Sequence, residues 1–322
     1  MDLLQEIKTR IESLAGAACE SGIKAAVKHI EVAEKHLARS RKEQEDDLLN
    51  DVVYRSNQAF EGMLKEAYSV FTETDASNKS PHQIERRLLK DDVLSSRVFE
   101  LFQNYRQNWR NPSTHDHTLF FNDQEALLAI VSVSAFAAVL VDQITGELSY
   151  RREKTKAVEK RDALSKLLEG YNELSFIDQA TLLLKAFSAD ISQKKSYLEK
   201  ASEAELLGRL SGFLTSVDPN LEINREPLYK TYLRPDLVIK KNSESIVIEI
   251  KRTRLLHVFL DSAIVQISNY LKAASTDYGI LYIPPFEANQ SMIIKHLDSA
   301  SGRKIIILTP KKSDRKGKDV NE

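Results

Sequence analysis

At 322 residues, 42% of them hydrophobic, the chain is long and apolar enough for two domains of ordinary size with real cores. Its formal net charge of −1 excludes a protein that binds nucleic acid through general positive charge, so phosphate binding would need local patches. The single cysteine, Cys19, excludes an internal disulfide, and Met1-Asp2-Leu3-Leu4 lacks the basic start of a signal peptide, so we expect a cytoplasmic protein.

Residues 1–150 are expected to form an all-helical bundle with no strand. Apolar residues recur at helical spacing between Ile23 and Glu61, where there is no Gly or Pro, and a short helix is expected near 82–90. The segment Ala126–Val141 is apolar all round but short for a membrane span, and Asn122-Asp123-Gln124-Glu125 before it forms a capping-box pattern. We therefore expect a central bundle helix or part of a dimer contact, and no membrane association.

The string Arg110-Asn111-Pro112-Ser113-Thr114-His115 follows a predicted helix over Arg97–Arg110. Proline disfavours helical backbone at the residue before it, so the helix is expected to end at Asn111, with His115 on a turn just beyond. An arginine can stabilise a negative transition state, and a histidine can move the proton of an RNA 2′-hydroxyl. An Arg and a His five residues apart also occur by chance.

This string and the upstream Asn57-Gln58-Ala59-Phe60-Glu61-Gly62 resemble the HEPN family of metal-independent ribonucleases, over about residues 1–150. The resemblance implies a helical domain that forms a homodimer, with Arg110 and His115 catalytic and Asn111 supporting. His117 stands where many HEPN motifs carry a tyrosine. Some HEPN domains are catalytically silent, so a purely binding or dimerising role stays open, and Asn57 and Glu61 fit either a site or a solvated helix face.

The stretch Arg151–Lys166 carries seven basic and three acidic residues. We expect a basic helical linker over 151–165, either solvated or in contact with nucleic acid. A second domain is expected over 166–310, followed by a polar tail over 311–322. Its expected elements are a helix over Leu206–Leu214, strands near 222–226, 233–240 and 245–251, a helix from Asp261 or Ser262 to about Lys272, a strand over Tyr278–Ile283, a helix over 286–300 and a strand over Lys304–Leu308.

The strands near 233–240 and 245–251 carry a possible metal site. Asp236 follows a proline that is tolerated at the start of a strand, and twelve residues separate it from Glu249, with Lys251 two further on. Alternation places Glu249 and Lys251 on one face with Val247. Two carboxylates suit Mg²⁺ (or Mn²⁺), the Ile250 carbonyl could add a ligand, and Lys251 could orient or deprotonate the attacking water. A surface charge pair is the alternative.

The α-β-β-β-α-β order, with these three residues, resembles the PD-(D/E)XK, or restriction-endonuclease-like, superfamily over roughly 165–310. The resemblance implies a central mixed sheet and a catalytic triplet of Asp236, Glu249 and Lys251. Gln266 and Tyr270, four apart on the next helix, resemble the signature of the RecB-like branch, where the pair supports the site and touches nucleic acid. Many members carry a further acid on the preceding helix, which makes Glu205 a possible metal ligand, in competition with Glu203.

These features predict an α+β protein of two domains and leave three functions open. The first is a dimeric, Mg²⁺-dependent nuclease that cuts DNA or RNA, in bacterial defence against foreign nucleic acid. The second is a metal-independent HEPN ribonuclease whose carboxy-terminal domain binds nucleic acid. The third is a non-catalytic dimeric interaction protein. The intact triplet favours the first, with DNA the more expected substrate of the carboxy-terminal site.

Overall fold

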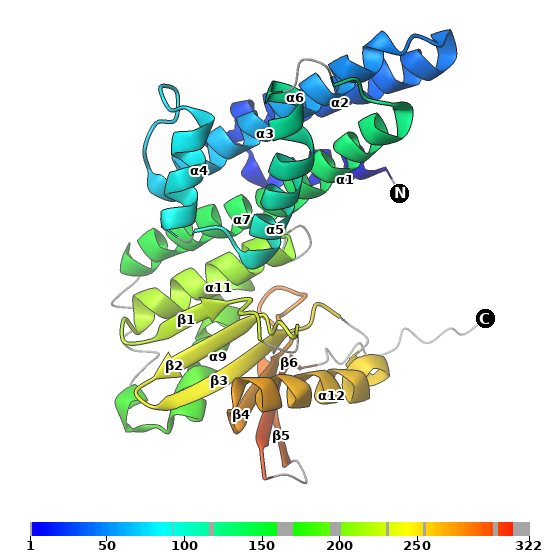
Figure 1. Ribbon diagram of the computed structural model, residues 1–322. Helices are drawn as coiled ribbons and strands as arrows, with labels where there is room; N and C mark the ends of the chain where they lie inside the picture. Colours follow the sequence, from blue (N-terminus) through cyan, green and yellow to red (C-terminus); the bar gives the residue numbers. More distant parts are fainter. Residues whose placement is uncertain are drawn as a thin grey trace, which may run out of the picture. The chain divides into compact units, whose positions relative to one another are not determined.

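We describe a computed structural model of the chain, which covers residues 2–91, 93–115, 119–159, 170–193, 201–229, 232–253, 256–298 and 302–311. At 114–115, 157–159, 256–257 and 298 only the backbone is described. The protein is α+β, with helices in its amino-terminal part and a six-stranded mixed sheet in its carboxy-terminal part (Figure 1). It divides into two compact units, Met1–Ser149 (unit 1) and Tyr150–Glu322 (unit 2).

Unit 1 is built from helices around one hydrophobic core, and its described residues contain no strand, as predicted. The long helices α2 and α3 supply a large part of the core, with Ile23, Ile30 and Phe60 among the fully buried side chains. The elements are α1 (Leu3–Ile11), a 3₁₀ turn (Glu12–Leu14), α2 (Glu20–Glu43), α3 (Asp47–Thr72), α4 (Pro81–Lys90), α5 (Ser96–Tyr105), the π-helical segment η2 (Arg106–Arg110), α6 (Asn111–His115) and the first part of α7 (Asp123–Glu159).

The start of α7 confirms the predicted capping box. The Asn122 N–H donates to the Glu125 carboxylate, and the Glu125 N–H donates to Asn122 Oδ1, each at 2.9 Å. Over Asp123–Lys156 the helix is long and apolar enough to cross a membrane, but 56% of its most apolar window is buried, and Phe136 is among its side chains in the unit 1 core. Packing in this core is sufficient to explain the apolar composition.

Unit 2 is a sheet of order β1-β2-β3-β4-β6-β5 with helices on both faces (Figure 1). β1, β2 and β3 are antiparallel neighbours, β3, β4 and β6 are parallel, and β5 runs antiparallel to β6. The helices α9 and α11 pack on one face and α12 on the other. The elements are η3 (Tyr171–Glu173), α9 (Phe176–Ile191), α11 (Glu203–Val217), β1 (Glu222–Arg225), β2 (Leu237–Lys241), β3 (Glu244–Ile250), α12 (Leu256–Ala274), β4 (Tyr278–Tyr282), β5 (Met292–Asp298) and β6 (Lys304–Pro310).

The predicted α-β-β-β-α-β order is confirmed by α11, β1, β2, β3, α12 and β4. Three details differ: β2 begins at Leu237 rather than near residue 233, α12 begins at Leu256, five residues before Asp261, and the helix predicted over 286–300 is wrong. That stretch contains β5, which pairs with β6 from Met292 opposite Pro310 to Asp298 opposite Lys304. Long-range pairing along an open sheet edge outweighs the local helix preference of the Lys, His and Leu residues there.

The first part of the predicted linker belongs to unit 2 and is folded against α11. Residues 150–159 are the carboxy-terminal end of α7, and Glu153, with 3% of its side chain exposed, accepts a 2.7 Å hydrogen bond from Arg209 Nε of α11. At Gly212 of α11, a Cβ would lie only 2.4 Å from the Tyr150 carbonyl oxygen. This close approach requires glycine and fixes the end of α7 on α11. Residues 160–169 lie outside the described part.

Candidate functional site

The three residues of the predicted triplet meet at one edge of the sheet in unit 2. Leu237 pairs with Ile248, so Asp236, just before β2, lies opposite Glu249 near the end of β3. The alternation holds as predicted: Ile246, Ile248 and Ile250 belong to the core under α9 and α11, whereas Val247 belongs to the core under α12. Asp236, Glu249 and Lys251 therefore share the face that α12 covers.

Hydrogen bonds hold the side chains of Asp236, Glu249 and Lys251 in position. The Ile250 N–H donates to Asp236 Oδ2 at 2.6 Å, and Lys251 Nζ donates to Glu249 Oε1 at 2.7 Å. The Asp236 N–H approaches Glu249 Oε2 at 3.4 Å. Glu249 has only 3% of its side chain exposed and Lys251 has 30%. A pair with one partner this deeply buried is not the solvated surface pair that the sequence left open as an alternative.

Because Pro235 has no N–H, the backbone carbonyl oxygen of Ile250 can serve as a further ligand at the site. Continuing the register from Leu237 opposite Ile248 places Pro235 opposite Ile250. In an antiparallel ladder such a pair would exchange two hydrogen bonds, but proline has no N–H to donate. The ladder therefore offers no donor to the Ile250 carbonyl. Because the N–H and carbonyl of one strand residue point to the same side, this oxygen faces the side on which the Ile250 N–H binds Asp236.

The surroundings of the Asp236 and Glu249 carboxyls disfavour the state in which both are ionised. Burial, reinforced by the Glu249 carboxylate, raises the pKa of Asp236 to about 8. Burial also raises the pKa of Glu249, although Lys251 opposes the change. Burial disfavours the Lys251 ammonium, but its hydrogen bond to Glu249 and the charge of Glu249 outweigh this effect and raise its pKa. The site thus combines a charged lysine with two acids that would be stabilised as anions by a cation.

Gln266 and Tyr270 lie beside this pair on α12. Gln266 Nε2 donates to the Tyr270 hydroxyl at 2.7 Å, which confirms that the two side chains share a helix face. Burial raises the pKa of Tyr270, and among the smaller effects are the charges of Glu249, Asp236 and Lys251. The tyrosine hydroxyl is therefore close enough to feel all three residues of the triplet.

Glu203, at the start of α11, is close enough for its charge to act on the pair. The charge of Glu203 contributes to the raised pKa of both Asp236 and Glu249. Burial raises the pKa of Glu205, and its charged neighbours are cations: Arg209, Arg152, Arg252 and Lys156. Residues two apart on a helix point roughly 200° apart, so only one of them can face the site. The sequence pattern did not show which.

The donor set fits a hard divalent cation. No three side chains of His, Cys, Asp or Glu come together to hold a metal among the described residues. Mg²⁺, however, often takes one or two carboxylates and completes its shell with backbone oxygens, waters and substrate phosphate oxygens. Asp236, Glu249 and the Ile250 carbonyl supply that partial shell, and the mutual destabilisation of the two carboxyls is the property that a cation would relieve.

The second predicted motif, in unit 1, has a different backbone from the one expected. Asn111 is helical (φ −67°, ψ −48°), and its N–H donates to the Arg106 carbonyl five residues back. The prediction that the helix ends at Asn111 is therefore wrong, because α6 continues to His115. A proline lacks an N–H and crowds the preceding turn, and the wider π-helical segment η2 accommodates Pro112 without ending the helix.

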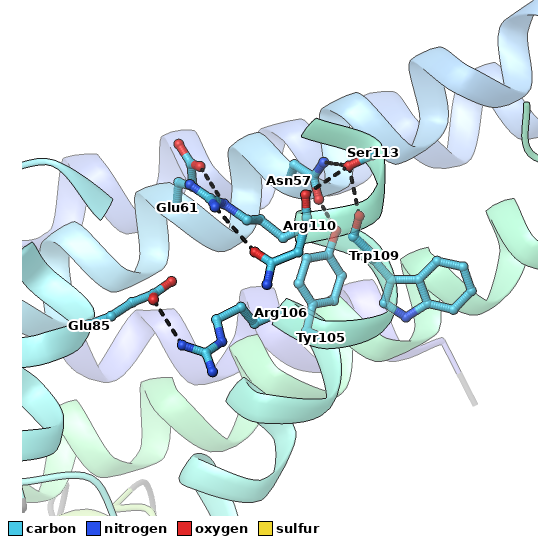
Figure 2. A network of polar contacts seen from close by, with 9 residues as sticks. Asn57, Glu61, Glu85, Tyr105, Arg106, Trp109, Arg110 and Ser113 are labelled. Carbon is cyan, nitrogen blue, oxygen red and sulfur yellow. Dashed lines mark hydrogen bonds and ion pairs between the residues drawn. The ribbon is translucent and has the colours of Figure 1, made fainter. Parts of the chain in front are cut away.

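Polar contacts hold this segment against α3 (Figure 2). Asn57 Nδ2 donates to Ser113 Oγ at 2.7 Å, and the Tyr105 hydroxyl donates to Asn57 Oδ1 at 3.0 Å. Ser113 Oγ also lies 2.7 Å from the Trp109 carbonyl, within the π-helical segment. The sequence pattern did not reveal Tyr105 and Ser113; a serine just after a proline in a helix was the available signal, since its hydroxyl can bond a carbonyl of the preceding turn.

Arg110 is oriented by two neighbours. Its Nε lies 3.4 Å from Glu61 Oε1, and its NH1 lies 3.3 Å from Asn111 Oδ1 (Figure 2). The sequence left Asn57 and Glu61 open between a site and a solvated helix face, and in the structure both contact residues of the motif. The side chain of His115 and the whole of His117 lie outside the described residues. The structure therefore places the arginine and asparagine of the motif together, and leaves the histidine as a prediction.

Comparison with known proteins gives no relative: no protein-family model, curated protein or solved structure matches the chain.

Proposed function

We propose that unit 2 is a divalent-cation-dependent nuclease domain of the PD-(D/E)XK type, which hydrolyses phosphodiester bonds in nucleic acid. The observation that supports this most is the convergence of Asp236, Glu249 and Lys251 on one face of one sheet edge. The six-stranded mixed sheet, with α12 between β3 and β4, agrees with the fold that the proposal requires.

Asp236, Glu249 and the Ile250 carbonyl would hold the ion. When bound, Mg²⁺ or Mn²⁺ would offset charge on the phosphate and lower the pKa of a bound water. Lys251, kept charged by Glu249, would orient the attacking water or a phosphate oxygen. Its raised pKa favours this role over that of a general base. Tyr270, itself held by Gln266, would support the site from α12.

The test is cleavage of labelled DNA and RNA by the full-length protein with Mg²⁺ or Mn²⁺, with and without EDTA. We expect EDTA, Glu249→Gln and Lys251→Ala each to abolish cleavage. Two matched controls remove the same charges nearby: Glu244→Gln, exposed on the same strand, and Lys240→Ala, exposed on β2. Cleavage that persists in Glu249→Gln, or is lost equally in Glu244→Gln, would contradict the proposal.

A second candidate function is a metal-independent ribonuclease site of the HEPN type in unit 1. The supporting observation is the orientation of Arg110 by Glu61 and Asn111 next to a π-helical segment, a feature found frequently at functional sites. Such cleavage should survive EDTA, act on RNA only, and disappear in Arg110→Ala and in His115→Ala. Arg86→Ala, an exposed arginine on α4, is the control.

Homodimerisation through the helical unit and a role against foreign nucleic acid are proposed on the family resemblances alone, and a cytoplasmic location is proposed on the single cysteine, Cys19. Sedimentation of the purified protein tests the first. If a dimer is found and neither cation-dependent nor cation-independent cleavage is detected, the third function, a non-catalytic interaction protein, is favoured instead.

A further inference from the structure

The edge of the sheet that carries the triplet also carries exposed aromatic side chains. β2 begins and β3 ends at this edge, so the loop that leads into β2 and the helix that follows β3 both start there. Tyr232, four residues before Asp236, is 88% exposed. Phe259, in the first turn of α12, is 50% exposed. An isolated exposed ring needs no explanation, but two rings at the edge that holds the candidate site do.

The hairpin between β1 and β2 presents Tyr232 in a defined way. The ladder continues irregularly past the strands: the Glu226 N–H donates to the Asp236 carbonyl at 2.9 Å, and the Tyr229 N–H donates to the Leu233 carbonyl at 3.1 Å. Tyr232 itself has left-handed backbone (φ 58°), and its N–H donates to the Tyr229 carbonyl. A left-handed tyrosine is uncommon, because glycine or asparagine suits such a turn better. The turn therefore holds a large ring out in solvent.

Basic side chains accompany the two rings. Arg234 lies between Tyr232 and Asp236 in the chain, and Arg252 follows Lys251 and is exposed. Arg252 also donates a hydrogen bond to the Ala201 carbonyl, which fixes its position at the start of the segment that leads into α12. Flat aromatic faces beside cationic groups match a strand of nucleic acid whose bases are unpaired, because its bases can stack while its phosphates meet the cations.

We propose that the substrate of the unit 2 site is a single strand, or an unpaired stretch, of nucleic acid whose bases stack on Tyr232 and Phe259. The inference rests on the proposed nuclease function and specifies its substrate class. A duplex keeps its bases stacked on one another, so it offers these rings no free base face. DNA and RNA share the stacking chemistry, and the test below separates them.

The test is equilibrium binding of the full-length Glu249→Gln variant, which prevents cleavage, to short fluorescein-labelled probes. The probes are a single strand of DNA, the same sequence in RNA, a duplex, and an abasic strand with the same phosphates and no bases. We expect a single strand to bind at least about tenfold more tightly than the abasic strand. Tyr232→Ala or Phe259→Ala, added to this background, should remove about tenfold of affinity for the single strand and leave abasic binding unchanged.

Conservative and matched variants make the test specific. Tyr232→Phe and Phe259→Tyr keep a ring and should bind normally. Tyr54→Ala removes a 56% exposed ring from α3 in unit 1, and Val265→Ala removes a 61% exposed apolar side chain further along α12; neither should change binding. Equal binding of abasic and normal strands, or unchanged binding in Tyr232→Ala and Phe259→Ala, overturns the inference. Cation-dependent cleavage by the wild-type protein would still stand in that case, so the two proposals fail separately.

Discussion

The two ends of β2 each carry a buried carboxylate cluster, and the clusters differ in how their charge is balanced. Beyond the last residue, Lys241, Asp218 Oδ2 accepts hydrogen bonds of 2.8 Å from both Lys241 Nζ and the Tyr171 hydroxyl. Before the first residue, Asp236 and Glu249 lie side by side, and the one lysine there, Lys251, donates to Glu249. Both clusters belong to unit 2 and lie at the two ends of one strand. The difference between them therefore comes from the side chains that surround each acid, not from the strand itself.

The pKa shifts of the two clusters have opposite signs. Burial alone would raise the pKa of Asp218, but hydrogen bonds from Lys241, Tyr171 and the Asn220 N–H outweigh it and lower the pKa. At Asp236 the same burial is reinforced by Glu249 and raises the pKa to about 8. A structural acid is thus fully satisfied by its neighbours, whereas the candidate functional acids are left in need of a cation. Unbalanced buried charge is a property that marks functional sites.

The largest predicted effect concerns the satisfied cluster. Lys241→Met should lower the free energy of unfolding of unit 2 by about 3 to 5 kcal/mol, because it leaves Asp218 buried without its cation. Lys240→Met, the adjacent residue with an exposed 3.5 Å pair to Glu222, should cost about 1 kcal/mol or less. Urea unfolding of both variants measures the difference. Equal costs would show that the cluster at Lys241 is not structural.

At the other end of β2 the predicted effect has the opposite sign. In EDTA, Asp236→Asn should raise the free energy of unfolding by about 1 to 2 kcal/mol, because it removes one of two adjacent buried acids and keeps an oxygen for the Ile250 N–H. The same variant should be inactive. A destabilised Asp236→Asn protein in EDTA would mean that the acid pair supports the fold rather than a cation.

A third prediction tests the role assigned to Pro235. Pro235→Ala restores an N–H opposite the Ile250 carbonyl, and this donor would compete with a cation for that oxygen. We expect Mn²⁺ affinity to fall roughly tenfold, as for changes next to metal ligands in general. Calorimetric titration of the two proteins with Mn²⁺ gives the ratio. Unchanged affinity would remove Ile250 from the proposed ligands.

The smallest predicted effect is on acid stability. Because the pKa of Asp218 is lowered on folding, this residue contributes stability that is complete above its unfolded pKa of about 3.9 and is lost as pH falls through the lower folded value. The free energy of unfolding of wild type should therefore fall more steeply below about pH 4 than that of Asp218→Asn. Parallel urea titrations over acid pH measure the two slopes, and equal slopes would contradict the balanced charge of this cluster.

Local sequence patterns correctly predicted those features of helices and strands that depend on neighbouring residues alone, such as which face of a strand is buried and where a helix begins. Strict alternation in Ile246-Val247-Ile248-Glu249-Ile250 was sufficient to place Glu249 on the face with Val247, and the reciprocal Asn122–Glu125 pattern was sufficient to start α7. Local patterns failed where pairing with residues distant in the sequence determines the secondary structure. β5 exists because β6 offers an unpaired edge, and no signal within residues 286–300 reveals that edge.

The same contrast, between what local sequence can and cannot predict, holds for the candidate sites. The spacing from Asp236 to Glu249 was readable because a short hairpin fixes which residues are opposite. The sequence did not show which of Glu203 and Glu205 faces the site, because this depends on how α11 is rotated against the sheet. The continuation of the helix through Pro112 was also not predictable from the local sequence, since Ser113 is held by Asn57 of α3, which in turn accepts a hydrogen bond from the Tyr105 hydroxyl.

The central claim is that Asp236 and Glu249 form a cation site, and calorimetric titration with Mn²⁺ and Mg²⁺ tests it most directly. The account predicts measurable heat of binding for the wild-type protein and for Asp218→Asn, and none at this site for Asp236→Asn or Glu249→Gln. Equal binding by all four proteins, or no binding by the wild type with a nucleic-acid strand present, would contradict it.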